Sequence, residues 1–313
     1  MIRQEKLQSL HTSVPQPKAR SIHFKTRALG IALLIPAAIF IAFTVLIPVV
    51  WNLVLSFAEW SPLTSMKLVG LNNYIELFHD QTTLNGFKYS IFIALVSSAV
   101  ALLLGLLLAL LVYRTGNREG AVFRLIFFAP NMMPFIVIGL MFTFMLDPAT
   151  GLVNHILGLI GLKNLQHAWL SEPGLVLWVL AVVSGWKGSG GVMMLFYTAI
   201  VTIPASMFEA ARLEGASYFR QIRLIILPLI MPTIRLVSML VLIGSFKTYD
   251  VVMTMTKGGP GDYSKTVPMQ MLDVGFRYNE FGYAAAIGVL FTILVGIVMF
   301  IAMKLARGDV YEY

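Results

Sequence analysis

The chain has 313 residues, of which 58% are hydrophobic and only 12% are charged, and its mean hydropathy is +0.81. This composition excludes an ordinary soluble globular domain and indicates a membrane protein. The sequence contains no cysteine, which excludes a disulfide framework, a thiolate zinc site, an iron–sulfur cluster and a cysteine nucleophile. The net charge of +8 must be interpreted from where the lysines and arginines lie relative to the membrane spans.

Six stretches are long and apolar enough to cross the membrane as helices, which takes roughly 20 residues each. They cover residues 28–54, 88–112, 122–146, 174–200, 229–246 and 282–303. Because none alternates with period two, helices are favoured over membrane β-strands. We therefore predict an all-α membrane protein with six transmembrane helices, a transmembrane domain over residues 28–303, and tails at residues 1–27 and 304–313. The fifth span is the shortest, and the sequence also allows it to begin before residue 229 or to continue past residue 246.

Positively charged residues are unevenly distributed between the loops. When the loops are assigned alternately to the two sides, fifteen lysines and arginines, Arg235 among them, fall on one side and seven on the other. The positive-inside rule then places both termini in the cytoplasm. The basic balance is thus explained by topology, and we expect no nucleic-acid partner.

The sequence lacks the residues that usually couple transport to an ion gradient, bind ATP or hold a catalytic metal. None of them contains Asp or Glu, although a proton- or sodium-coupled carrier usually needs an intramembrane carboxylate. The chain has no phosphate-binding G-x-x-x-x-G-K-[ST] motif, and its five histidines lack metal-ligand spacing. We expect no catalytic residue, no metal site and no enzyme activity in this chain, and an energy source outside it.

Small residues recur at helical spacing in the second span, at Ala101, Gly105 and Ala109. Such stripes let helix backbones approach closely. We expect this stripe to serve helix packing rather than ligand binding.

The long connection between the fourth and fifth spans, residues 204–228, contains a recognisable pattern. Pro204 and Gly215 predict a short helix, a turn and a second helix. Glu209-Ala210-Ala211, Gly215, Ile225 and Leu227-Pro228 reproduce the pattern E-A-A-x3-G-x9-I-x-L-P. This pattern resembles the signature loop of the permeases of binding-protein-dependent ABC importers.

The resemblance extends to other segments. WNLVLSFAEW at residues 51–60, VGLNNYIELF at 69–78, MTKGGP at 255–260 and FGYAAAI at 281–287 look like the carbohydrate-uptake branch of this family. The chain is similar to the larger membrane subunit of maltose-type systems, but it has six spans and a modest outer loop where that subunit has extra spans and a large insert.

This resemblance implies a permease subunit in the bacterial inner membrane. Its implied partners are a second permease, a dimer of ATP-binding subunits, an extracytoplasmic substrate-binding protein and membrane lipid. ATP and Mg would be held by the ATPase, and no cofactor by this chain. The signature loop would supply the coupling helix, with Glu209, Ala210, Ala211, Gly215 and Ala216 as the residues that contact the ATPase. An ordinary capped helix hairpin is the alternative.

The fourth span is interrupted in sequence by Trp186-Lys187-Gly188-Ser189-Gly190-Gly191. We expect its three glycines to weaken the helix near the middle of the membrane and Lys187 to face a cavity. By resemblance, this segment and the end of the fifth span fall where the maltose permease binds sugar. The candidate substrate-pathway residues are Trp186, Lys187, Gly188, Ser189, Gly191, Ser245, Lys247, Tyr249 and Asp250.

Two of these residue choices leave alternatives open. The Trp186 ring could stack on a sugar or pack against a neighbouring helix. Lys187 and Lys247 are costly in a dehydrated passage, so either Asp250 neutralises one of them in a structural ion pair or the cargo is anionic. An anionic cargo would be a uronate oligosaccharide of the alginate type, or a phosphate ester.

The segment 256–266 is rich in turn-forming residues. Gly258, Gly259, Pro260 and Asp262 predict an exposed outer loop that contacts the binding protein, or else a passive linker. The leading functional hypothesis is an ABC importer permease for a carbohydrate. The alternative is an ion-coupled secondary transporter or channel, and a membrane-embedded enzyme comes third.

Overall fold

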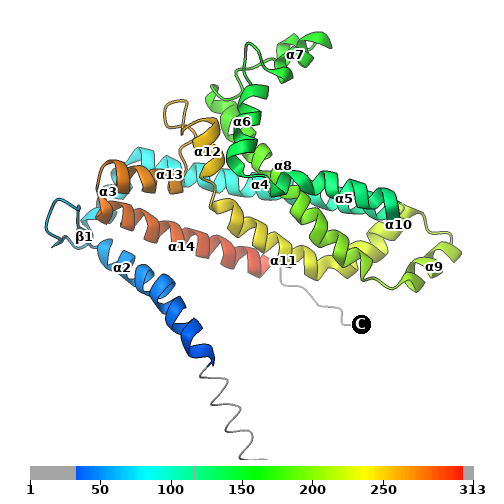
Figure 1. The fold of residues 1–313 in the computed structure, drawn as a ribbon, viewed down its shortest axis with the longest axis horizontal. Coiled ribbons are helices and arrows are strands. Elements are labelled where there is room, and N and C mark those ends of the chain that lie inside the picture. Colours follow the sequence, from blue (N-terminus) through cyan, green and yellow to red (C-terminus); the bar gives the residue numbers. More distant parts are fainter. Residues whose placement is uncertain (1–32, 116, 306–313) are drawn as a thin grey trace, which may run out of the picture. The chain divides into compact units, whose positions relative to one another are not determined.

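The structure is a computed structural model that describes residues 33–115 and 117–305 (Figure 1). It divides into two units between Asn52 and Leu53, and each is described by itself. The expected tail at residues 1–27, and most of the tail at 304–313, lie outside the described residues. The first unit holds most of an apolar helix, Leu33–Leu55, whose side chains are mostly exposed as far as Val54, whereas Leu55 is buried. This helix includes the π-helical turn η2 (Ala42–Leu46) and α2 (Ile47–Leu55).

The expected spans correspond to helices in the described chain. Four of the five helices long and apolar enough to cross a membrane belong wholly to the second unit. They are α4 (Gln81–Arg114), α8 (Pro173–Val201), the helix Tyr218–Phe246 and α14 (Phe281–Leu305). The fifth expected span therefore begins well before residue 229, and Arg235, which we had assigned to a loop, lies inside this helix.

The third expected span, 122–146, is not one straight helix. It consists of α5 (Asn117–Met132) and α6 (Phe135–Met145), which meet at an angle of 95°. Pro134 lies at the break and has an extended ψ of 144°. A proline disfavours helical geometry in the residue before it and lacks an N–H for the helix ladder, so α5 and α6 do not join into one helix. The described residues thus contain six spans only if this bent pair is counted as one.

Helices α4 and α8 pack along each other at the centre of the second unit. A β-carbon on Gly105 would lie 2.5 Å from Cγ1 of Val192, and one on Gly185 would lie 2.6 Å from the carbonyl oxygen of Ser97. Ala101 and Ala109 are buried in the same interface. The packing role expected for the small-residue stripe is confirmed.

Shorter elements complete the second unit. At one end (Figure 1) lie an antiparallel hairpin, with Ala58 opposite Leu68, and α3 (Asn72–His79). The remaining elements are β1 (Ala58–Glu59), β2 (Lys67–Leu68), α7 (Leu152–Leu159), η3 (Lys163–Leu165), α9 (Ala205–Leu213), α10 (Tyr218–Gln221), η4 (Ile222–Ile226), α11 (Leu227–Phe246), α12 (Asp250–Met255), α13 (Val267–Leu272) and η5 (Asp273–Arg277). Helix α11 packs on α4, α8 and α14, and α12 packs on α6.

Candidate functional site

The connection between α8 and α11 folds as the expected helix, turn and helix, at the end of the second unit far from the hairpin (Figure 1). Helix α9 begins after Pro204, whose ψ of 132° is extended. The chain then turns at Gly215, and α10 starts after Ser217, whose Oγ accepts a hydrogen bond from the Arg220 N–H at 3.4 Å. From there the helix continues through η4 into α11.

Gly215 ends α9 in a left-handed conformation, with φ of +77°. Its N–H donates to the carbonyl of Arg212 at 3.0 Å, and the N–H of Ala216 donates to the carbonyl of Ala211 at 2.9 Å. This is the bonding pattern of a Schellman motif, which favours glycine at the left-handed position. No atom lies within 4 Å of where a β-carbon on Gly215 would be, so the backbone conformation alone requires glycine.

Buried side chains fix this helix pair to α4. Phe208 is 4% exposed, and its ring centroid lies 5.8 Å from that of Tyr113. The hydroxyl of the half-buried Tyr218 donates to the carbonyl of Leu110 in α4 at 2.7 Å. Within the helix pair itself, the amide of Gln221 donates to the carbonyl of Ala216 at 3.1 Å. These anchoring residues are not among those predicted from the sequence, although Phe208 stands out there as the large aromatic residue in a helix of mostly small and polar ones.

Much of the remaining surface of α9 is uncovered, from its flank at Glu209 to the side opposite Phe208. Glu209 and Ala210 are exposed and Ala211 is half-buried. Leu213 is 91% exposed, and Phe219 beyond the turn is 74% exposed. Within the described chain, nothing covers these two large apolar side chains or the small residues beside them.

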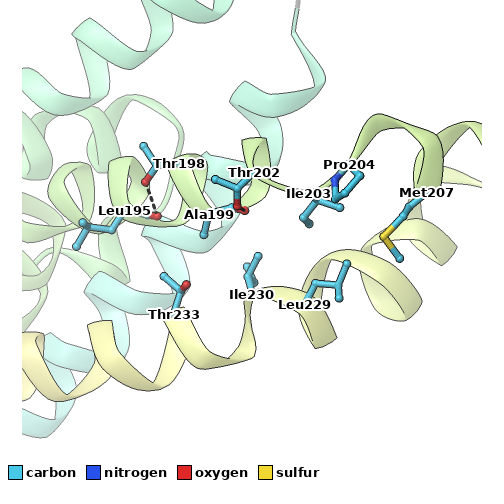
Figure 2. Close-up of a pocket in the computed structure, with 10 residues that line it drawn as sticks. All are labelled: Leu195, Thr198, Ala199, Thr202, Ile203, Pro204, Met207, Leu229, Ile230 and Thr233. Carbon is cyan, nitrogen blue, oxygen red and sulfur yellow. Dashed lines mark hydrogen bonds between the residues drawn. The ribbon is translucent and has the colours of Figure 1, made fainter. Parts of the chain in front are cut away.

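A cavity of about 620 Å³ lies between α8, α9 and α11 (Figure 2). The Thr198 hydroxyl donates to the Leu195 carbonyl at 2.8 Å and the Thr202 hydroxyl to the Ala199 carbonyl at 2.8 Å, so both hydroxyls are bonded within their own helix. The lining residues are Leu195, Thr198, Ala199, Thr202, Ile203, Pro204, Met207, Leu229, Ile230 and Thr233. Helix α9 is therefore not tightly packed on this flank.

A second cavity of about 320 Å³ contacts α9 where it faces α4, α5 and α8. Nη1 of Arg124 donates to the Tyr197 hydroxyl at 2.8 Å, and the guanidinium carbon lies 4.6 Å from the centre of that ring. The lining residues are Tyr113, Thr115, Arg124, Tyr197, Val201, Ile203, Ala205, Phe208, Glu209 and Arg212. This cavity is lined by more polar groups than the first.

Helix α8 is continuous from Pro173 to Val201, so the expected interruption at residues 186–191 is wrong. Two of the three glycines, Gly190 and Gly191, serve close contact instead. A β-carbon on Gly190 would lie 2.3 Å from the carbonyl oxygen of Phe127, and one on Gly191 would lie 3.2 Å from Nδ2 of Asn131. Because neighbouring helices hold α8 on these sides, its backbone stays helical despite the glycines' weak intrinsic preference for helix.

Lys187 is packed against the bend between α5 and α6. It is 7% exposed, its Nζ donates to the Asn131 carbonyl at 3.3 Å, and Nζ lies 4.1 Å from the centre of the Phe135 ring. The expectation that Lys187 faces a cavity is therefore corrected, because a carbonyl and an aromatic face occupy that position.

The neighbours of Lys187 also pack inside the chain. The Trp186 and Phe142 rings meet edge to face with centroids 5.4 Å apart, which favours the packing interpretation of Trp186. Ser189 is 3% exposed and donates to the Trp186 carbonyl at 2.7 Å, while Gly188 faces the β-carbon of Ala101.

The candidates at the end of α11 are divided between interior and surface. Ser245 accepts a hydrogen bond from Ser98 of α4 at 3.0 Å, and Tyr249 packs in the same apolar cluster as Trp186. Lys247 and Asp250 are exposed. Within residues 33–115 and 117–305, Asp250 forms no ion pair with either lysine, so the structural ion pair considered above is not formed.

The segment 256–266 is exposed only at Lys257 and at its tip. Gly261, Asp262 and Tyr263 are exposed, whereas Gly258 is buried and Gly259 and Pro260 are half-buried. This corrects the expectation of an exposed loop throughout, and the reason is an internal anchor.

That anchor is Lys265. Its Nζ lies 2.8 Å from Oδ2 of Asp273 and 3.7 Å from Oδ1 of Asp262. Burial alone would lower the pKa of Lys265, but the hydrogen bond and charge of Asp273 and the charge of Asp262 raise it above its ordinary value.

Comparisons with known proteins cover most of the chain. Residues 101–307 match the family described as binding-protein-dependent transport system inner membrane component. The chain is 33% identical to the probable ABC transporter permease protein YurN of Bacillus subtilis, over 87% of this chain and 93% of that protein. It is 29% identical to the diacetylchitobiose uptake system permease protein NgcF of Streptomyces coelicolor, over 94% and 87%.

The fold is likewise similar to a solved structure. A chain of a bacterial ABC transporter involved in the import of the acidic polysaccharide alginate superposes with a TM-score of 0.78, over 91% of this chain and 97% of that one. The sequence identity is 21%, so this likeness concerns the fold.

Proposed function

Because the chain belongs to the family of binding-protein-dependent transport system inner membrane components, we propose that it is the permease subunit of an ATP-driven importer and that its cargo is a carbohydrate. The observation that carries this proposal is the helix pair at residues 205–226, which is anchored to α4 on one face and exposes Leu213 and Phe219 on the other.

We propose that α9 is the coupling helix. Its small residues, the exposed Ala210 and the half-buried Ala211, would fit a cleft on an ATPase subunit, and Leu213 and Phe219 would be apolar anchors in the same interface. The Tyr218 hydroxyl bond to Leu110 links this surface to α4. Closure of an ATPase pair would move α9, and α4 and α11 would move with it so that the membrane passage opens alternately to the two sides.

In the proposed orientation, α9 and both termini of the chain lie in the cytoplasm. The end of the second unit that carries the β1–β2 hairpin lies on the outer side of the membrane. The positive-inside distribution of lysines and arginines supports it. The further partners that we propose are a second permease, a pair of ATP-binding subunits carrying ATP and Mg, and an extracytoplasmic binding protein that touches the tip Gly261–Tyr263. Catalysis of ATP hydrolysis would belong to the ATPase alone.

The carbohydrate cargo is supported by the name of the relative NgcF, an uptake permease for diacetylchitobiose. That the carbohydrate is an anionic oligosaccharide is a prediction about the charge of the cargo. It now depends on Lys247, which is exposed at the end of α11, since Lys187 already has the Asn131 carbonyl and the Phe135 ring as partners.

Co-purification tests the function. An affinity-tagged chain, extracted from its native membrane in mild detergent, should bring down an ATPase and a second permease, and the complex should hydrolyse ATP faster when the loaded binding protein is added. Gly215→Trp should remain in the membrane and lose the ATPase. Purification of the wild-type chain without any ATPase, or transport at wild-type rates by Gly215→Trp, would contradict the proposal.

A further inference from the structure

The cavity of about 320 Å³ beside α9 has the features of a ligand site that the coupling role does not use. Its volume lies within the range of about 300 to 1,000 Å³ that is usual for small-molecule pockets. Its lining residues include two arginines, Arg124 and Arg212, and one acidic residue, Glu209. Two cations against one anion leave the lining positively charged.

The hydrogen-bonding groups of this cavity are mostly donors. Arg124 uses one N–H on Tyr197, which leaves further N–H groups of the same guanidinium for a ligand. The Tyr197 hydroxyl accepts that bond, so its own proton is available. In the described part of the chain, the side chains of Arg212 and Glu209 make no ion pair, and the Tyr113 hydroxyl makes no hydrogen bond.

From this arrangement we propose that the cavity binds a small soluble phosphate monoester, such as a sugar phosphate. A phosphate group has three acceptor oxygens and matches the planar fork of arginine. Its acceptors meet the two guanidinium groups and the two tyrosine hydroxyls, and the rest of the cavity holds the sugar.

The ligand would bridge α9 to the helices behind it. Arg212 and Glu209 belong to α9, whereas Arg124 belongs to α5, Tyr113 to α4 and Tyr197 to α8. Occupancy would therefore hold α9 against the bundle. An effect of the ligand on coupling rests on the proposed function, because it requires α9 to be the coupling helix. The binding of the ligand does not depend on that function.

Equilibrium dialysis of the full chain alone, in phosphatidylcholine nanodiscs, tests the binding with labelled glucose 6-phosphate. Saturable binding is expected, with no binding of glucose. Arg212→Met and Arg124→Met should each weaken it about ten-fold or more, because each removes a charge-assisted contact. Glu209→Gln should tighten it, and the matched control Arg118→Met, an exposed arginine outside the lining, should bind like wild type.

Three results would overturn the proposal. The first is no saturable binding of glucose 6-phosphate by the wild-type chain. The second is equal weakening by Arg118→Met and Arg212→Met, which would indicate general charge attraction. The third is retention of phosphatidylglycerol that depends on Arg212, without binding of the sugar phosphate, which would assign the cavity to a lipid headgroup. Since no ATPase is present, none of these results depends on whether the chain is an importer subunit.

Discussion

Gly190 of α8 lies directly against the backbone of Phe127 in α5, so closely that a β-carbon at position 190 would come within 2.3 Å of the Phe127 carbonyl oxygen. The contact is backbone against backbone, and neither side can move without shifting a helix. This close backbone contact is the reason for a glycine in the middle of a transmembrane helix that is continuous rather than broken.

The first prediction follows from this contact. Gly190→Ala should lower the stability of the chain by about 1–3 kcal/mol or more, the usual cost of overpacking. The matched control is Gly188→Ala, two residues away in the same helix, where a β-carbon would meet nothing closer than 3.8 Å. Thermal unfolding in detergent measures both variants. Equal melting temperatures would show that α5 and α8 are not in this contact.

The second prediction concerns the turn after α9. Gly215→Ala should destabilise the turn by about 1 kcal/mol, because a side chain in the left-handed region is strained even in open space. Gly215→Asn should recover most of this loss, since asparagine tolerates that conformation. ATPase stimulation by loaded binding protein in the purified complex should follow the same order. If alanine and asparagine behave alike, the positive φ is not what the position requires.

The third prediction concerns acid stability. Asp80 accepts bonds from the N–H groups of Thr82 and Thr83 and from the Tyr283 hydroxyl at 2.9 Å, which ties the start of α4 to α14. Burial alone would raise the pKa of Asp80, but these hydrogen bonds and the Thr83 hydroxyl hold it below the ordinary 3.8. A lowered pKa contributes stability that is present above the unfolded value and is lost as pH falls through the folded value.

Wild-type stability should therefore decline as pH falls below about 4, and Asp80→Asn should lose about 1–3 kcal/mol at neutral pH and decline less. Unfolding measured across this pH range checks both statements. Asp250→Asn serves as the control, because the Asp250 carboxylate is exposed and bonds to nothing in the described segments. If Asp80→Asn loses as much stability at acid pH as the wild type does, the loss is due to other carboxylates.

The fourth prediction separates the two lysines. Lys247→Met should reduce uptake of anionic oligosaccharides and spare neutral ones, because Lys247 is exposed where α11 ends. Lys187→Met should affect both cargoes alike through packing, since its ammonium group already contacts Phe135 and Asn131. Uptake in cells at matched expression is the measurement. Unchanged anionic uptake in Lys247→Met would remove the remaining support for an anionic cargo.

The fifth prediction maps the contact with the binding protein. A cysteine introduced at Asp262, on the exposed tip of the segment 256–266, should crosslink to the binding protein in at least one nucleotide state. A cysteine at Ser264, which is 0% exposed, should not. The chain has no natural cysteine, so every crosslink is assigned without ambiguity. Failure at Asp262 in all nucleotide states would contradict the contact.

The sequence by itself determined the membrane class, the approximate spans and the helix, turn and helix at residues 204–228. Each of these depends on local properties: about 20 apolar residues are enough to span a bilayer, and proline and glycine act on their own backbone, as at Pro204 and Gly215. The bend at Pro134 was also local, and that proline was the signal that could have revealed it.

Only the tertiary structure decided the role of the other glycines and of the buried charges. Gly190 differs from Gly188 because Phe127 lies beside one of them, and Lys187 is satisfied by residues of the α5–α6 bend that are distant in sequence. The cavity beside α9 likewise takes its lining from α4, α5, α8 and α9. Contacts between helices depend on which faces meet in space, and a hydrophobic pattern without polar asymmetry leaves those faces undetermined.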